Sequence, residues 1–256
     1  MTNIWVVCRK ELKSYFASPI AYIVLAMFAV IFGFFFYSAT AIFVDYSIRS
    51  AMQRGMAPPM NINDFIIRPL LTNVSVIVLF LMPMITMRLF AEEKRTGTME
   101  LLMTSPLRDI EIILGKCLAA FLLYLCLLGI SALNLIFLFL HGKPDWRAVL
   151  VGYLGLFLMG AAFLGLGAFI STLTRNQIIA ASLTFGLFLL LWVLDWVQSY
   201  SPGPVGKVIA SLSIVTHFEP FSKGVLELKD AVYYLSVIFL GIFLTARSME
   251  SLRWRS

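Results

Sequence analysis

The most chemically distinctive residues of this sequence lie in one short charged stretch, EEKRTGTMELLMTSPLRDIEIILGK, at positions 92–116. Charged residues open the stretch, Gly97 follows them, and a short amphipathic turn comes next. The apolar and polar residues of that turn fall on opposite helical faces, with Met99, Leu102 and Met103 on one and Glu100 and Thr104 on the other. A short amphipathic turn beside a run of charged residues is suited to binding. It can dock into a groove of a cytoplasmic partner or rest on lipid at the membrane surface.

Motifs of the common catalytic sites are missing from the sequence. Gly115-Lys116 is followed by Cys117, and no glycine stands five residues before Gly115, so the nucleotide-binding pattern GxxxxGK[ST] is not met. HExxH and GxSxG do not occur, and the two histidines, His141 and His217, fall in predicted external segments. The three cysteines form no CxxC pair and are interpreted as packing residues: Cys8, Cys117 and Cys126. We therefore expect no enzyme activity, cofactor or metal in this chain.

Long apolar runs must position the charged stretch. Of the 256 residues, 60% are hydrophobic and 13% charged, whereas a soluble domain carries about 25% charged residues. A helix needs roughly 20 apolar residues to cross a bilayer, and its backbone satisfies its own hydrogen bonds there. We predict one all-α integral membrane domain over residues 1–256. Its six spans lie at about 18–44, 70–91, 117–140, 148–173, 177–198 and 231–247, the last being barely long enough.

The positions of Lys and Arg predict the orientation. With the N-terminus in the cytoplasm, 12 of the 20 Lys and Arg residues fall inside and the other 8 outside. The inside residues crowd the span ends, where the positive-inside rule applies. Both termini are therefore predicted to be cytoplasmic. The formal charge of +6 is explained by this asymmetry and by anionic lipid, so no nucleic-acid binding is expected.

Segments outside the spans carry signals of their own. Residues 3–17 predict an amphipathic helix in the headgroup plane, because Ile4, Trp5, Cys8, Leu12, Tyr15 and Phe16 share one face. Ser18-Pro19 and Ser105-Pro106 each predict an N-cap followed by the first residue of a helix. Residues 45–67 are predicted to be an irregular loop, and residues 199–229 to form re-entrant or interfacial helices before the last span.

Two features within the spans are interpreted structurally. Asp195 lies beside Trp192 and Trp196, which places it at the outer headgroups rather than in a proton relay. The fourth span carries a face of small residues suited to close helix packing, either within the bundle or at a dimer seam: Ala161, Gly165, Ala168 and Thr172.

The charged stretch resembles the coupling-helix region of permease subunits of the ABC type-2 exporter family. The shared features follow the family's order: an acidic start at 92–93, Gly-Thr at 97–98, Glu-Leu-Leu at 100–102, Thr-Ser-Pro-Leu at 104–107 and Leu-Gly-Lys at 114–116. The stretch lies between spans two and three, as in the family, and the helix at 3–17 resembles its elbow helix. Residues 216–236, THFEPFSKGVLELKDAVYYLS, are similar to gliding-motility permeases and, more distantly, to the permease of nitrous-oxide-reductase maturation.

The resemblance implies a permease subunit of an exporter in the bacterial inner membrane. A second copy or a different permease would complete a dimer, and separate cytoplasmic ATPase subunits would hold ATP and Mg. Within the coupling region 92–106, Glu92 and Glu93 would carry polar contacts, Met99 and Leu102 would fill the groove, and Gly97 would allow the bend. The implied coupling residues are Glu92, Glu93, Gly97, Thr98, Met99, Glu100, Leu101, Leu102, Thr104, Ser105 and Pro106.

Two other functions stay open. One is an ATP-driven transmembrane anchor that transmits force without moving a substrate, which the motility-like relatives make plausible. The other is a secondary transporter. The sequence shows neither paired buried charges nor clear internal repeats, and their lack weighs against this function.

Overall fold

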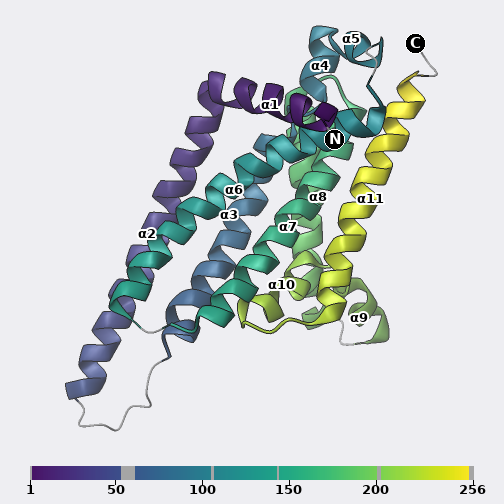
Figure 1. Ribbon diagram of the computed structural model, residues 1–256. Coiled ribbons are helices and arrows are strands. Elements are labelled where there is room, and N and C mark those ends of the chain that lie inside the picture. Colours follow the sequence, from purple (N-terminus) through teal and green to yellow (C-terminus); the bar gives the residue numbers. More distant parts are fainter. Residues whose placement is uncertain (1, 53–60, 105–106, 143, 201–202, 254–256) are drawn as a thin grey trace.

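The computed structural model describes residues 2–52, 61–104, 107–142, 144–200 and 203–253. The elements run in the order α1 (Thr2–Ala17), α2 (Pro19–Met52), η1 (Asn63–Ile67), α3 (Arg68–Thr86), α4 (Ala91–Thr96), α5 (Met99–Thr104), α6 (Asp109–His141), α7 (Trp146–Leu173), α8 (Gln177–Tyr200), α9 (Pro204–Ala210), α10 (Ile214–Ser222) and α11 (Leu228–Arg253). The long helices form a bundle, and α1 lies across one end of it (Figure 1).

Six helical segments are long and apolar enough to cross a membrane, counted over the described residues. They are Pro19–Ser50, Asn63–Thr96, Asp109–His141, Trp146–Leu173, Gln177–Val197 and Leu228–Leu252. The predicted all-α fold with six spans is confirmed. The last span, predicted to be barely long enough, belongs to a helix of 26 residues, about 39 Å long at 1.5 Å per residue.

Two predicted boundaries are wrong. Helix α2 continues to Met52, so residues 45–52 are helical rather than part of a loop, and the Asp45–Arg49 ion pair of 3.0 Å joins successive turns there. Residues 63–67 are helical too, whereas the Met56–Met60 motif lies outside the described residues.

The start of the third long helix also differs from the prediction. Helix α6 begins at Asp109 with Arg108 at the N-cap, not at the predicted Ser105-Pro106, which lies outside the described residues. The Arg108 N–H donates to the Glu111 carboxylate at 3.0 Å, so a side chain of the first turn satisfies the backbone at this end. The other predicted cap is present: the Ile20 N–H donates to the Ser18 hydroxyl at 3.4 Å, and α2 begins at Pro19.

Helices α3 and α7 form the centre of the bundle. In their apolar segments 72% and 61% of the residues are buried, compared with 17–22% in α2, α8 and α11. Small residues let α7 pack closely, because a Cβ on Gly241 of α11 would lie 2.8 Å from the Gly165 Cα. Thr172 of the same face donates to Ser248 of α11 at 2.7 Å. This small-residue face therefore serves packing within the bundle.

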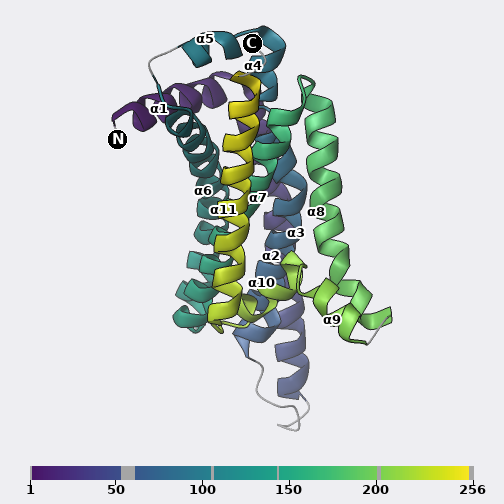
Figure 2. The same ribbon diagram turned by 90° about the vertical axis from the view of Figure 1, so that its right-hand side faces the viewer.

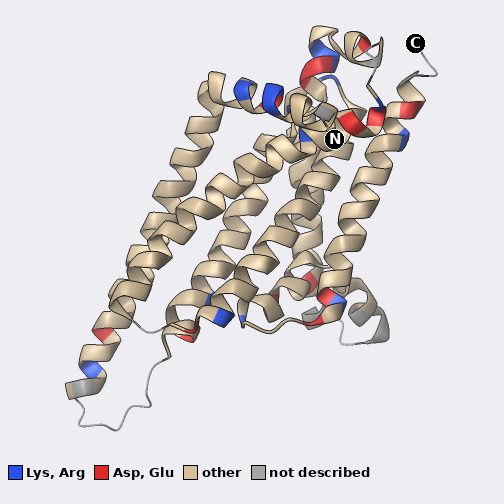
Figure 3. Cartoon of the chain, in the orientation of Figure 1, with Lys and Arg blue, Asp and Glu red and all other residues tan. Residues whose placement is uncertain are grey.

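Charged residues gather at the two ends of the bundle (Figure 3). We call the end with α1, α4, α5 and both chain termini the hairpin end, and the opposite end, with α9 and α10, the distal end (Figures 1 and 2). Two short helices precede α11, as predicted for 199–229. Asp195 lies near the distal end of α8, where its carboxylate accepts a hydrogen bond from Thr216 of α10 at 2.8 Å.

Candidate coupling site

Helices α4 and α5, which contain the first part of the charged stretch, form a helical hairpin at the same end of the bundle as α1 (Figure 2). Helix α4 ends at Gly97, whose φ of 74° is left-handed, and α5 begins two residues later. A side chain at this φ would be strained, so the bend that was predicted at Gly97 is confirmed. The hydroxyls of Thr96 and Thr98 lie 2.9 Å apart across the bend. We call residues 91–104 the hairpin.

The base of the hairpin is attached to the last turn of α7. The Ser171 hydroxyl accepts hydrogen bonds from the backbone N–H groups of Phe90 and Ala91, both at 3.0 Å, and donates to the Met87 carbonyl at 3.2 Å. The first N–H groups of a helix have no partner within it, so Ser171 acts as a cap supplied by another helix. Lys94 donates to the Thr172 carbonyl at the C-terminal end of α7, where the helix dipole favours a cation.

A buried ion cluster fixes the same helix to α6 and α1. The Lys116 ammonium is 2.8 Å from a carboxylate oxygen of Glu93 on α4 and 2.8 Å from one of Glu11 on α1. Only 2% of the Lys116 side chain is exposed, and its charge lies 5.6 Å from the centre of the Phe90 ring. We call these three charged residues the Lys116 triad. The second oxygen of Glu93 is buried and has no hydrogen-bond partner among the described residues.

The triad corrects the interpretation that the chain lacks paired buried charges. It lies at the hairpin end and joins three helices, rather than lying midway along the spans. Glu92 is also paired within the chain, since Arg88 donates to it at 2.8 Å and also reaches the Ser18 hydroxyl at 3.4 Å. Both glutamates that begin the coupling region thus hold the hairpin to its own bundle.

Helix α5 turns its apolar face inward. Met99 is 6% exposed and packs in the core, and Leu102 is half-buried against it. The expectation that Met99 fills a groove of a partner is therefore wrong for this conformation, because its side chain is already covered. Leu101 is 71% exposed, and around it lies the rest of the hairpin tip, which we define by its exposed residues among the described side chains: Arg95, Thr96, Gly97, Thr98, Glu100, Leu101 and Thr104. Ser105 and Pro106 lie outside the described residues.

Helix α1 packs on the start of α6 through the face predicted to be apolar. Cys8 and Tyr15 are buried, Ile4 and Leu12 are partly buried, and Trp5 and Phe16 stay exposed beside the bundle. Burial raises the pKa of the Tyr15 phenol far above its ordinary value, and burial together with Glu11 raises the pKa of the Cys8 thiol. Both side chains are therefore neutral at physiological pH.

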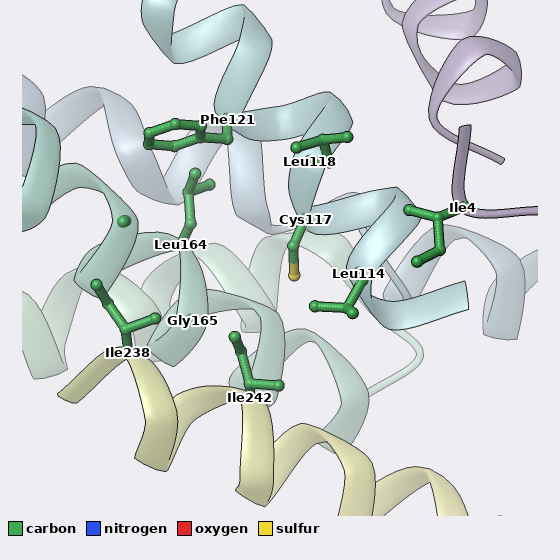
Figure 4. Close-up of a pocket in the computed structure, with 10 residues that line it drawn as sticks. Ile4, Leu114, Cys117, Leu118, Phe121, Leu164, Gly165, Ile238 and Ile242 are labelled. Atoms are coloured by element: carbon green, nitrogen blue, oxygen red, sulfur yellow. The ribbon is translucent and has the colours of Figure 1, made fainter. Parts of the chain in front are cut away.

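An apolar groove of about 340 Å³ lies beside α1, between α6, α7 and α11 (Figure 4). Its lining residues are Ile4, Leu114, Cys117, Leu118, Phe121, Ala161, Leu164, Gly165, Ile238 and Ile242. A lining of this kind suits hydrocarbon and offers nothing to hold a polar or charged ligand. Across the described residues, no group of three or more His, Cys, Asp or Glu side chains is placed to hold a metal ion.

The family model for ABC-2 family transporter proteins matches residues 5–215. The chain belongs to the ABC-2 transporter family. The match covers α1, the hairpin and five of the six candidate spans, all on one continuous segment. No curated protein matches the chain. Membrane components of ABC-2 transporters are typically non-catalytic and work with a separate ATPase subunit, so membership implies such a partner.

Sequence reasoning missed the residues that anchor the hairpin. Glu11 lies seven residues after Ile4 and four before Tyr15, on the face of α1 that packs inward, so its position alone marked it as a buried carboxylate in need of a partner. Lys116 comes two residues after the apolar run Ile112-Ile113-Leu114 and ends the Leu-Gly-Lys motif, and neither feature predicts that it pairs with two carboxylates. No local pattern marks Ser171, because its partners are 80 and 81 residues away.

Proposed function

We propose that this chain is the permease subunit of an ATP-driven ABC-2 exporter and that the hairpin couples a separate cytoplasmic ATPase to the helix bundle. The observation that carries the proposal is the division of the hairpin into a fixed base and an exposed tip. Its base is bonded to α7 through Ser171 and to α6 and α1 through Lys116. A force applied at the tip therefore reaches three helices of the bundle.

The tip offers a small surface on which a partner can dock. Leu101 is its one large apolar side chain exposed among the described residues, and Glu100 and Thr104 lie beside it as polar rim. A leucine that enters a partner's groove, with polar contacts around it, fits the helix-in-groove mode of binding. The coupling residues predicted between 92 and 106 thus have two roles. Glu92 and Glu93 hold the base of the hairpin, and Leu101 with its polar neighbours contacts the partner.

The proposed orientation places the hairpin end in the cytoplasm. Both termini lie at this end, as an even number of spans requires, and 12 of the 20 Lys and Arg residues were assigned to it. The chain would then be a multi-pass protein of the bacterial inner membrane with ATP and Mg bound by its partner, not by itself. The dimer with a second permease copy, of the same or another kind, belongs to the same proposal.

Co-purification tests the docking surface. Tagged protein is extracted from its native host in mild detergent, and the bound proteins are identified by mass spectrometry and assayed for ATPase activity. We expect wild type to carry a nucleotide-binding subunit and Leu101→Asp to lose it, because the charge cannot enter an apolar groove. Leu226→Asp is the matched control: Leu226 is 57% exposed at the distal end, and its variant should retain the subunit. Absence of any ATPase from wild type would reject the proposal.

A second candidate is the ATP-driven transmembrane anchor that moves a partner protein without a translocated substrate. The similarity of residues 216–236 to gliding-motility permeases favours it, and so does the length of α2, whose 34 residues span about 51 Å and exceed the roughly 30 Å hydrocarbon core. Both candidates require the ATPase. They separate when the purified complex is reconstituted: an exporter changes the content of sealed vesicles on ATP addition, and an anchor hydrolyses ATP without doing so.

A further inference from the structure

His217 of α10 lies between two oxygen acceptors at the distal end. Its Nδ1 atom is 2.7 Å from Asp230 Oδ1 in the first turn of α11, and its Nε2 atom is 2.8 Å from the backbone carbonyl oxygen of Ser211. The Tyr233 ring stacks on the imidazole with centroids 3.9 Å apart and an interplanar angle of 18°. Asp230 is 1% exposed, and its other oxygen has no hydrogen-bond partner among the described residues.

This arrangement fixes the number of protons. A carbonyl oxygen only accepts, so Nε2 must carry a hydrogen. A neutral imidazole then has a bare lone pair at Nδ1, which would face the lone pairs of an Asp230 carboxylate at 2.7 Å. Both contacts are hydrogen bonds at the same time only when one more proton is present, either on Nδ1 as imidazolium or on the carboxyl group. A buried carboxylate without that proton would also be left unneutralised.

We propose that His217 and Asp230 form a proton-binding site that clamps α10 onto α11, and that loss of this proton loosens α10. The clamp is closed at low pH and loosens as the pH rises, since the Asp230 and Ser211 hydrogen bonds of His217 form together only while the proton is present. Histidine is the side chain that ordinarily changes charge between about pH 5 and 8, which is the range the titration below covers. Under the orientation proposed above, the distal end senses the external pH. The proton site itself does not depend on that orientation.

The consequence of opening follows from what α10 covers. Phe218 and Phe221 are 2% and 0% exposed. Phe221 packs against Gly155 of α7 so closely that a Cβ added to Gly155 would lie 2.5 Å from the Cβ of Phe221. Tyr234 and Tyr233 donate to the Ile214 and Leu212 carbonyls at 2.9 and 2.7 Å. These two hydrogen bonds hold the start of α10 whether or not the His217–Asp230 site carries its proton. Loss of the proton therefore frees the middle of the helix and uncovers the distal end of α7.

The other charged groups around α10 have partners of their own. From α8, Asp195 accepts from Thr216, and on α10 itself Glu219 binds Lys223 at 2.7 Å and Arg68 of α3 at 3.4 Å. The hydrogen bond from Lys223 lowers the pKa of Glu219. The remaining charged neighbours are Asp145 and Arg147 at the start of α7 and the Glu227–Lys229 pair before and within α11. Carboxyl, Lys and Arg groups ordinarily titrate outside about pH 5 to 8, so a pH response of α10 within that range would report on the His217–Asp230 site.

Nuclear magnetic resonance tests the proton directly, because the chain has two histidines. The full chain is labelled with ¹⁵N-histidine, purified in detergent without any ATPase, and titrated. A His141→Gln variant assigns the two signals, and His141, which is exposed, serves as the reference in wild type. We expect His217 to show a protonated pair at low pH that deprotonates as the pH rises, and in Asp230→Asn to show the neutral Nε2–H form throughout.

Hydrogen exchange measures the clamp. After correction for the intrinsic exchange rate, protection of the α10 amides in wild type should fall at least about tenfold, equivalent to about 1.4 kcal/mol, as His217 loses its proton. In Asp230→Asn an amide N–H can donate to the neutral Nδ1, so α10 should stay protected at every pH. Asp195→Asn removes a carboxylate from the same end without touching His217 and should keep the wild-type pH dependence.

Two results would overturn the proposal. One is α10 protection that does not change while the His217 signal titrates. The other is an Asp230→Asn variant that shows the same pH dependence as wild type. Gel filtration and helical circular dichroism establish that each variant is folded before it is compared. None of these measurements involves the ATPase, so the proton site can fail while the coupling proposal stands, and the reverse.

Discussion

Replacing Lys116 with methionine is the sharpest test of how the hairpin is held. The substitution keeps the volume and removes the charge that lies 2.8 Å from both Glu93 and Glu11. At an effective dielectric constant of about 20, each of these contacts is worth about 6 kcal/mol of Coulomb attraction, opposed by a desolvation cost of several kcal/mol per ion. Removal of one partner from a buried cluster typically costs about 3–5 kcal/mol, because the remaining charges stay buried without compensation.

The expected change is large enough to measure by thermal unfolding. A chain of this size loses about 2–4 °C in Tm per kcal/mol, so Lys116→Met should lower Tm by about 6–20 °C. The assay follows the fluorescence of the five tryptophans in detergent. Glu93→Gln is the matched control: it leaves the Lys116–Glu11 pair in place and removes the excess negative charge, so its cost should stay below about 1 kcal/mol.

The same variant separates docking from transmission. Lys116→Met leaves Leu101 exposed and Ser171 bonded to the start of α4, so an ATPase should still bind. Its hydrolysis should be coupled less tightly to movement of the bundle, because the bonds from the hairpin to α6 and α1 are gone and only those to α7 remain. A cost below about 1 kcal/mol for Lys116→Met, or an equal cost for Glu93→Gln, would refute the reasoning, since the triad would then carry no net stabilisation.

Two further predictions concern the bend and the base of the hairpin. Gly97→Ala places a Cβ at a φ of 74° and should destabilise the bend by about 1–2 kcal/mol, seen as faster limited proteolysis of the hairpin, whereas Gly33→Ala in open helical space of α2 should be neutral or stabilising. Ser171→Ala leaves two buried N–H groups of residues 90 and 91 without an acceptor and should cost about 1–3 kcal/mol in unfolding free energy, whereas Ser251→Ala on the exposed side of α11 should cost less than about 0.5 kcal/mol.

Features governed by local sequence were predicted well from it. Six long apolar runs sufficed for six spans because a bilayer imposes length and hydrophobicity on each helix independently. Ser18-Pro19 began a helix as expected, and Gly97 formed a left-handed bend, since both depend on backbone geometry within a few residues. The boundary error at Met52 arose because the Asp45–Arg49 ion pair extends a helix beyond its apolar run. The error at Asp109 arose because the Glu111 carboxylate accepts from the Arg108 N–H and so caps the helix three residues after the predicted start at Pro106.

Features governed by distant contacts could not be read in the same way. The 3.6-residue period correctly gave α5 an apolar face, but periodicity does not say whether such a face meets a partner or the chain's own core. Burial of Met99 decides this, and among the described side chains of α5 it leaves Leu101 as the exposed apolar residue. The pairing of Lys116 with Glu11 spans 105 residues and depends on how α1 lies across α6, which no local pattern encodes.

Helix α7 joins the two functional regions of the molecule. Its last turn caps α4 through Ser171, its middle crosses α11 at Gly165, and Gly155 near its distal end packs against Phe221 of α10. A continuous helix of 28 residues, about 42 Å long, moves largely as a unit, so a tilt imposed at the hairpin displaces the surface on which α10 rests. The proton on His217 and Asp230 acts on that same surface from the other side, because it decides how firmly α10 is held to α11. An ATPase at one end and a proton at the other would therefore both shift the equilibrium between positions of α7.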